Sequence, residues 1–242
     1  MENAGYIALS RQMTLRREME VIANNMANLN TPAFKNQSML FVEYLETTEG
    51  GEKMSFVQDI SLVRNLTEGQ MAATENPLDI AISGQGYFEI ETPVGARYTR
   101  NGVFQLNADR ELVTSSGQRV LGEGGGPIAL PPNSANVTIT RDGTISTEQG
   151  PAGRLRLARF ENEQAMVKLA DGLYDPDGQD PLPADGAEVV QGMVEGSNVQ
   201  GIIELTKMIE TVRSYSSTAK LVNDEHERLR RAIQSLAGTA QA

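Results

Sequence analysis

The residues of this chain that could do chemistry are few, and they lie far apart in the sequence. His226 is the only histidine, and it falls inside a run of regularly spaced apolar residues. A Ser-His-Asp triad or a histidine metal cluster would therefore have to be built on a side chain buried between helices. We interpret His226 instead as a polar position that helps to set the register of packed helices. The chain has no cysteine, which excludes thiolate catalysis, disulfides and zinc-thiolate sites.

An acidic cluster brings Asp175, Asp177 and Asp180 close together and raises the question of a calcium site. An EF-hand loop requires glycine at its sixth position and glutamate at its twelfth, where this chain has Asp180 and Gly186. A plain turn is the better interpretation. The glycines within 122–126 lack the following Lys-Ser or Lys-Thr of a phosphate-binding loop. We therefore expect no catalytic residue, no metal site, no cofactor and no enzyme activity.

Charge and hydropathy exclude further classes of protein. The chain has 242 residues, a net charge of −11 and no cluster of Lys and Arg that could meet a phosphate backbone, which argues against nucleic-acid binding. No apolar run reaches the length of a membrane-spanning helix, so we expect no direct membrane insertion. The N-terminus lacks the basic region, apolar core and cleavage site of a secretory signal, so export would need another route.

The C-terminal residues predict a long helix with one apolar face. Apolar residues recur there at alternating spacings of three and four, the period at which an α-helix presents the same face to a partner helix. Ser197 and Gln200 have the spacing of a capping box and mark the expected start, and Gly238 marks the end. This C-terminal seam consists of Leu205, Met208, Val212, Tyr215, Ala219, Val222, His226, Leu229, Ile233 and Leu236.

The N-terminal residues predict a second helix of the same kind, from about Gly5 to Asn30, because Pro32 moves Thr31 out of the α region. Two helices side by side leave much of each seam uncovered, and apolar area left in water forgoes about 25 cal/mol per Å². We expect neighbouring molecules to cover the rest, and the ends to be mostly disordered before assembly. The N-terminal seam consists of Leu15, Met19, Ile22, Met26 and Leu29, extended weakly by Ala8 and Gln12.

The region between the helices predicts a mostly antiparallel β domain, because short alternating runs are separated by turn residues. Asn101-Gly102 and Asp142-Gly143 each lie between two such runs and predict hairpins, since both residue types tolerate positive φ. The predicted strands are residues 78–82, 86–91, 96–100, 103–106, 111–114, 136–140, 154–160 and 188–195.

The fold class that follows is α+β, with the terminal helices paired as a coiled-coil domain and an all-β centre. We expect an N-terminal core helix in residues 1–35, an extended, irregular connector in 36–75, a β-rich outer domain in 76–195 and a C-terminal core helix in 196–242.

Three motifs resemble those of the bacterial flagellar axial proteins, which form the rod and hook. The first is VIANNMANLNTPAFK, residues 21–35, in which an Ala-Asn-Asn-hydrophobic-Ala-Asn stretch is followed by Asn-Thr and an aromatic-Lys pair. Ala33 departs from the glycine usual in the family. The second is the stretch from NPLDIAI to GGPIALPP, in which Arg110 and Glu111 replace a common Asp-Gly. The third is EGSNVQGIIELTKMIETVRSYSS, where Ser-Asn-Val begins the last helix and Arg213 and Tyr215 follow.

The resemblance implies a structural subunit of the flagellar basal-body rod, whose opening residues and compact length are most similar to the proximal rod proteins. It implies assembly with copies of itself and with other rod proteins, export through the flagellar type III apparatus, and a place in the basal body, where the rod spans the periplasm. The alternatives are a distal rod protein or another axial component and, from a different class, a ligand-binding or enzymatic domain with coiled-coil ends.

The expected assembly interface combines the two seams with the polar residues of the motifs. Its residues are Leu15, Met19, Ile22, Asn24, Asn25, Met26, Asn28, Leu29, Asn30, Phe34, Ser197, Asn198, Val199, Leu205, Met208, Val212, Arg213, Tyr215, Val222, Leu229, Ile233 and Leu236.

Overall fold

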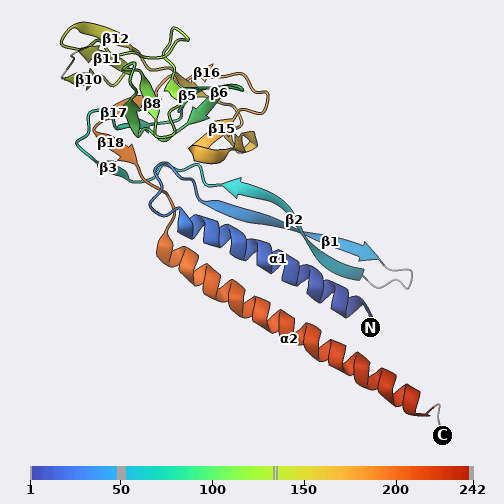
Figure 1. Ribbon diagram of the computed structural model, residues 1–242. Coiled ribbons are helices and arrows are strands. Elements are labelled where there is room, and N and C mark those ends of the chain that lie inside the picture. The colour runs from blue at the N-terminus through green and yellow to red at the C-terminus, as the bar shows by residue number, and fades with distance from the viewer. Residues whose placement is uncertain (1, 48–52, 133, 135, 240–242) are drawn as a thin grey trace. The chain divides into compact units, whose positions relative to one another are not determined.

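The computed structural model describes residues 2–47, 53–132, 134 and 136–239, and the chain divides into two compact units (Figure 1). Unit 1 is made of Met1–Ala27, Gln37–Arg64 and Gln200–Ala242. Unit 2 is made of Asn28–Asn36 and Asn65–Val199. The chain therefore passes four times from one unit to the other.

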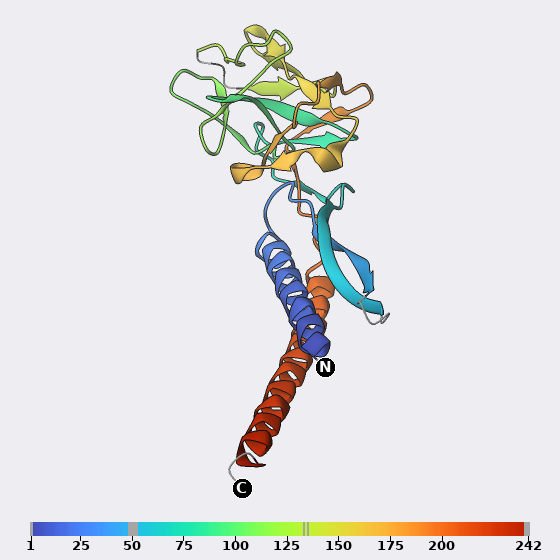
Figure 2. The same ribbon diagram turned by 90° about the vertical axis from the view of Figure 1, so that its right-hand side faces the viewer.

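Unit 1 contains two helices, α1 (Glu2–Ala27) and α2 (Gly201–Thr239), and two strands, β1 (Gln37–Thr47) and β2 (Lys53–Arg64). The helices lie side by side and run in opposite directions in both ribbon views (Figures 1 and 2). The predicted helices at the two ends of the chain are thus confirmed, and their pairing as a coiled coil stays a prediction. No helix of the described residues is long and apolar enough to cross a membrane.

The strands β1 and β2 form an antiparallel ribbon where the sequence predicted an irregular connector. The register of this ribbon shifts between Leu40 and Phe41, so one strand carries an extra residue there. The partners of Leu40 and Phe41 are Ser61 and Asp59, so the extra residue is Ile60 of β2. In β1 itself, Met39, Leu40 and Phe41 are consecutive apolar residues, which lack the alternation by which a strand is recognised in a sequence. Residues 48–52, which the sequence analysis also assigned to the connector, lie outside the described residues.

Unit 2 is built from short antiparallel strands, which confirms the predicted antiparallel β region. The largest sheet has the strand order β14-β15-β6-β5-β9-β8-β7, with β13 joining β5 and β16 joining β13. Smaller sheets pair β10-β11-β12, β17-β4 and β18-β3. The strands are β3 (Met71–Ala73), β4 (Ile80–Ser83), β5 (Tyr87–Thr92), β6 (Gly95–Thr99), β7 (Phe104–Leu106), β8 (Leu112–Thr114), β9 (Arg119–Val120), β10 (Val137–Ile139), β11 (Thr144–Thr147), β12 (Gly150–Arg154), β13 (Leu157–Arg159), β14 (Val167–Lys168), β15 (Leu173–Asp175), β16 (Leu182–Pro183), β17 (Glu188–Gln191) and β18 (Met193–Glu195). Short 3₁₀ helices occur at Glu163–Ala165 and Ala170–Gly172.

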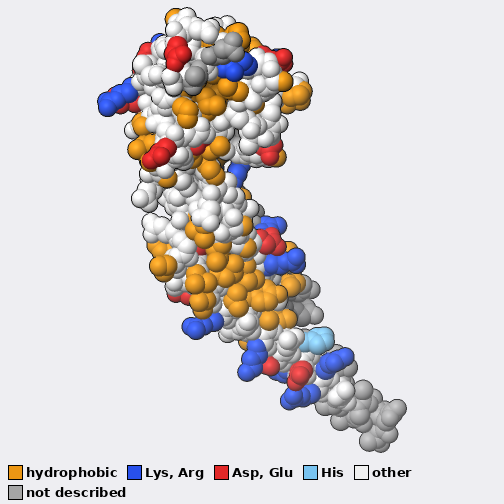
Figure 3. Space-filling view, turned by 60° about the vertical axis from the view of Figure 1, so that its left-hand side comes forward, with side chains coloured by type: hydrophobic (Ala, Val, Ile, Leu, Met, Phe, Trp, Pro, Cys, Tyr) orange, Lys and Arg blue, Asp and Glu red, His pale blue; other side chains and the backbone are white. Residues whose placement is uncertain are grey.

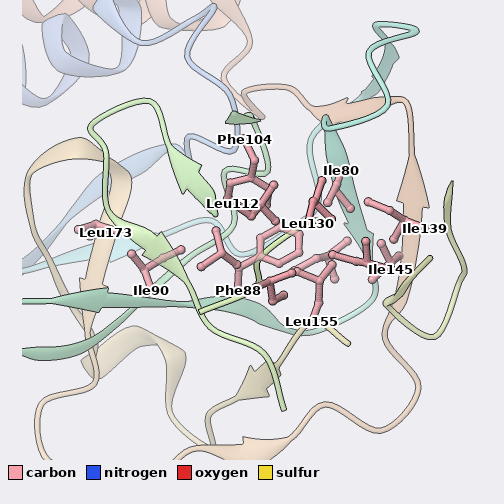
Figure 4. Packing of buried hydrophobic residues seen from close by; sticks show 14 residues of the cluster. Ile80, Phe88, Ile90, Phe104, Leu112, Leu130, Ile139, Ile145, Leu155 and Leu173 are labelled. Atoms are coloured by element: carbon pink, nitrogen blue, oxygen red, sulfur yellow. The ribbon is translucent and has the colours of Figure 1, made fainter. Parts of the chain in front are cut away.

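The core of unit 2 lies on both faces of β5. Phe88 and Ile90 are two residues apart and fully buried, so they point to one face, into a cluster of aliphatic side chains and Phe104 (Figure 4). The rings of Phe88 and Phe104 meet edge to face, with centroids 5.1 Å apart. Tyr87 points to the opposite face, where it packs on Phe160 and other aromatic side chains.

One of the two predicted hairpins is confirmed and the other is wrong. Asp142-Gly143 connects β10 to β11, and Gly143 has φ +84°. Asn101-Gly102 does not connect a hairpin, because β6 pairs with β5 and β15 while β7 pairs with β8. Gly102 is needed for close packing instead: the Ile80 N–H donates to the Gly102 carbonyl, and a Cβ on Gly102 would lie 1.6 Å from the Ile80 carbonyl oxygen.

Candidate assembly surface

The face of α2 that is buried within unit 1 carries polar residues at intervals of seven. Glu204, Thr211 and Thr218 are 2%, 6% and 8% exposed. The hydroxyls of Thr211 and Thr218 donate to backbone carbonyls one turn earlier in α2, so their burial leaves no donor unsatisfied. Glu18 of α1 interacts with Thr211; burial raises the pKa of Glu18, while the Thr211 hydroxyl and the Lys207 ammonium oppose that shift.

The predicted C-terminal seam is divided between this buried face and an exposed one. Met208, Tyr215 and Val222 are half-buried beside the polar residues. Leu205 and Val212 are 49% and 43% exposed, so they do not form the face that α2 buries within unit 1. Apolar periodicity does not predict this buried polar face; the signal for it in the sequence is the seven-residue spacing of Glu204, Thr211 and Thr218. His226 is likewise exposed, and the side chains of Leu229, Ile233 and Leu236 lie outside the described residues.

An exposed row of apolar side chains runs along the first turns of α2, and we call it the apolar stripe. Its residues are Ile202, Leu205, Ile209 and Val212, which are between 43% and 83% exposed. Their spacings of three, four and three place them on one face of the helix. Figure 3 shows hydrophobic side chains gathered over the helices of unit 1. A contiguous exposed apolar surface of this kind marks a site of interaction.

The N-terminal seam is largely covered within unit 1. Ile22 is 3% exposed, and Leu15, Met19 and Met26 are half-buried. Helix α1 begins and ends three residues earlier than predicted, at Glu2 and Ala27. Leu29, expected to continue the seam, therefore lies beyond the helix, in unit 2.

Asn25 of the first motif joins three elements of unit 1. Its side-chain amide accepts the Gln37 N–H at 3.0 Å and donates to the Gln37 carbonyl at 2.7 Å, the two bonds that a neighbouring strand would make. Its Nδ2 also donates to Glu204 Oε2 at 3.0 Å, and Lys207 Nζ donates to Glu204 Oε1 at 2.8 Å. Asn25 is 1% exposed. The last turn of α1, the start of β1 and the first turn of α2 are thereby tied together.

The remaining asparagines of the first motif have different surroundings. Asn24 and Asn30 are exposed. Asn28 lies in unit 2 and stabilises a turn with Thr31, whose N–H donates to the Asn28 carbonyl and whose hydroxyl donates to Asn28 Oδ1. The four residues are thus not brought together in one place.

The end of the first motif enters a buried charged cluster in unit 2. Lys35 Nζ lies 2.6 Å from Glu195 Oε1, and Arg100 Nε lies 2.8 Å from Glu195 Oε2. The three side chains are 4%, 2% and 5% exposed. The Gly69 N–H also donates to Glu195 Oε1. Burial alone would raise the pKa of Glu195, but Arg100, Lys35 and the Gly69 N–H together hold it below its usual value.

Asn198 of the closing motif makes a second set of bonds within unit 2. Its Oδ1 accepts the Asn36 N–H at 2.7 Å, and its Nδ2 donates to the carbonyls of Asn65 and Thr67, both at 2.8 Å. The Asn198 N–H donates to the Phe34 carbonyl at 3.2 Å. Asn198 thus connects residues that are far apart in the sequence.

The remaining residues of the predicted interface have the following surroundings. Ser197 does not cap α2: its hydroxyl accepts the Val199 N–H, and α2 begins at Gly201. Phe34 is buried, with Lys168 Nζ 3.9 Å from its ring centroid. Ala33 has φ +56°, the left-handed region that explains why glycine is usual at this place in the family. Of the other predicted residues, Val199 is 9% exposed and Arg213 is exposed.

The described part of the chain contains no group of three or more His, Cys, Asp or Glu that could hold a metal ion. Asp175 and Asp177 lie in a turn in which Asp177 has φ +51° and its N–H donates to Asp175 Oδ1.

Three family models match the chain in the same order as the three motifs. One is described as "Flagella basal body rod protein" and covers residues 6–35. A second, "Flagellar hook protein FlgE/F/G D1 domain", covers 81–147, and a third, "Flagellar basal body rod FlgEFG protein C-terminal", covers 190–235. Helical ends enclosing a β domain with these motifs define the class of flagellar axial proteins.

Relatives along the whole chain identify the family more closely. The flagellar basal-body rod protein FlgF of Caulobacter vibrioides is 41% identical over 98% of both chains. FlgF of Mesorhizobium japonicum is 33% identical, again over 98% of both chains. The rod protein FlgG of Agrobacterium fabrum is 34% identical over 91% of this chain and 94% of its own length. The chain belongs to the flagellar basal-body rod protein family, and it is a structural subunit of the rod.

Proposed function

We propose that this chain forms part of the proximal rod and assembles into a helical shaft through its terminal helices. The observation that carries the proposal is the apolar stripe, Ile202, Leu205, Ile209 and Val212, which α2 leaves exposed. Full burial of one such side chain stabilises a complex by about 1.5–3 kcal/mol, so these half-exposed side chains favour association by a few kcal/mol together.

The kind of contact determines the kind of assembly. If subunits are to add without limit, the apolar stripe of one subunit must contact a different surface on its neighbour. Such a heterologous contact, repeated around an axis, generates a helical assembly. Torque is then carried by many lateral contacts rather than by one site. We propose copies of this chain and other rod proteins as the partners, and the exposed members of the predicted interface on α2, Leu205, Val212 and Arg213, as part of their contact surface.

The state of the chain before assembly follows from the same reasoning. A single helix without its partners loses chain entropy without burying its apolar face. We propose that α1 and α2 are mostly unpaired in the isolated subunit, and that the subunit leaves the cytoplasm through the flagellar type III apparatus and reaches the part of the rod that spans the periplasm.

Labelling of the subunit in purified basal bodies tests the proposed position. A tag on the chain is expected to appear on the rod close to the inner membrane. A second candidate is a place in the distal rod. A label found only on the outer part of the rod would support that candidate and refute the proximal one.

A further inference from the structure

Three of the four passages of the chain between the units are joined by the side chains of Glu195 and Asn198 in unit 2. The boundaries fall after residues 27, 36, 64 and 199. Lys35 and Asn36, next to the second boundary, bond to Glu195 and Asn198. Asn65 and Thr67, next to the third, accept hydrogen bonds from Asn198 as well.

These bonds join segments that the chain itself keeps far apart. Lys35 and Glu195 are separated by 160 residues, and Asn36 and Asn198 by 162. The Ala33 N–H donates to the Glu195 carbonyl at 2.8 Å, which adds a backbone bond between the same two segments. The entropy of closing loops of this length is therefore already lost once unit 2 is folded.

The buried charges make this arrangement specific. Glu195 faces two cations and is 2% exposed, so separating the segments would leave buried charges without their partners. Breaking a buried ion pair in this way is strongly unfavourable. Arg100 also donates to the carbonyls of Gly84 and Gly86, which fixes the cluster to the strands of unit 2.

We infer that Glu195 and Asn198, with their bonded partners, form a clasp that stays closed while α1 and α2 are unpaired. Residues 28–32 and 199–200 are then all that separates the clasp from the end of α1 and the start of α2. The two helices accordingly meet first at Asn25 and Glu204 and pair from there toward their far ends, because the clasp holds these ends at high effective concentration. Pairing during assembly rests on the proposed function, whereas closure of the clasp in the free subunit does not.

Amide hydrogen exchange of the full chain in dilute solution, resolved by NMR, tests closure. The amides of Ala33, Asn36 and Gly69, which are bonded within the clasp, are expected to exchange slowly while amides in the middle of α1 and α2 exchange fast. Exchange of the three clasp amides as fast as the helix amides would overturn the inference. This result is independent of where in the flagellum the subunit is found.

A matched pair of variants tests the consequence for assembly. Asn198→Ala removes a side-chain amide that accepts one backbone N–H and donates to two carbonyls. Gln191→Ala removes another with the same pattern, because Gln191 accepts the Ile139 N–H and donates to the carbonyls of Pro77 and Val137.

Asn198→Ala is expected to speed amide exchange at Asn36 by about tenfold or more and to leave exchange at Ile139 unchanged. Gln191→Ala is expected to speed exchange at Ile139 and to leave exchange at Asn36 unchanged. In cells, only Asn198→Ala is expected to reduce the number of assembled rods and the swimming diameter. Unchanged exchange at Asn36 in Asn198→Ala would overturn the clasp. Equal rod numbers in the two variants would overturn its role in pairing.

Discussion

Replacing Val212 by Asp is expected to stop rod assembly without unfolding the subunit. Val212 is 43% exposed, so burying the remainder in an assembly is worth about 1 kcal/mol. A carboxylate at this position would be desolvated against the apolar surface of a neighbouring subunit, which costs several kcal/mol more. A combined change of about 4 kcal/mol weakens each contact by roughly a thousandfold. In the free subunit the same exposed position is expected to change the free energy of unfolding by no more than about 0.5 kcal/mol.

The assay compares Val212→Asp with Val94→Asp, the same chemical change at a valine that is 75% exposed in unit 2. Each variant replaces the chromosomal gene, and swimming diameter, purified rods and the thermal melt of the isolated subunit are measured. We expect unchanged melts in both, and loss of rods and motility in Val212→Asp only. If cells with Val212→Asp build rods and swim as the unmodified strain does, the apolar stripe is not an interface.

Three further changes test the side chains described above. Asn25→Asp places a second carboxylate against Glu204 and is expected to reduce motility. The added change Glu204→Gln is expected to restore motility. If the double variant swims no better than Asn25→Asp, the result argues against the contact between Asn25 and Glu204. The pKa of Glu195 lies below its usual value, so its stabilising charge is present above pH 4.5 and is lost as pH falls through the lowered pKa. The melting temperatures of Glu195→Gln and the unmodified chain are therefore expected to differ at pH 6 and to converge as pH falls through the lowered pKa of Glu195; a constant difference would contradict this. Gly102→Ala is expected to unfold unit 2 in circular-dichroism melts, with Gly124→Ala, where a Cβ meets nothing within 4 Å, as the unaffected control.

The sequence predicts the local parts of this fold well. Alternating runs predict strands such as β5, because one face of that strand, which carries Phe88 and Ile90, lies in the core. Asp142-Gly143 gives a hairpin because its geometry depends on residues next to one another. The two terminal helices are predicted by their apolar period, although the face that α2 buries is polar and Ser197 was wrongly expected to cap α2.

The parts that the sequence did not predict depend on residues far apart or on exceptions to a pattern. The consecutive apolar residues Met39, Leu40 and Phe41 concealed β1, because they do not alternate with polar ones. The face that α2 buries within unit 1 is polar, and Glu204 can be buried there because Asn25 and Lys207 bond to it.

The motif resemblance identified Asn25 and Asn198 as site residues but did not predict the residues to which they bond. Lys35 and Glu195 are separated by 160 residues, and no local spacing connects them.

The most direct test of assembly through the apolar stripe uses a single thiol. The chain contains no cysteine, so Ile209→Cys introduces a unique reactive group at a position that is 45% exposed. The rate of maleimide labelling is measured in the dilute subunit and in purified basal bodies from a strain that swims with this variant. We predict fast labelling of the subunit and strong protection in the basal bodies; equal rates in both would contradict assembly through this face.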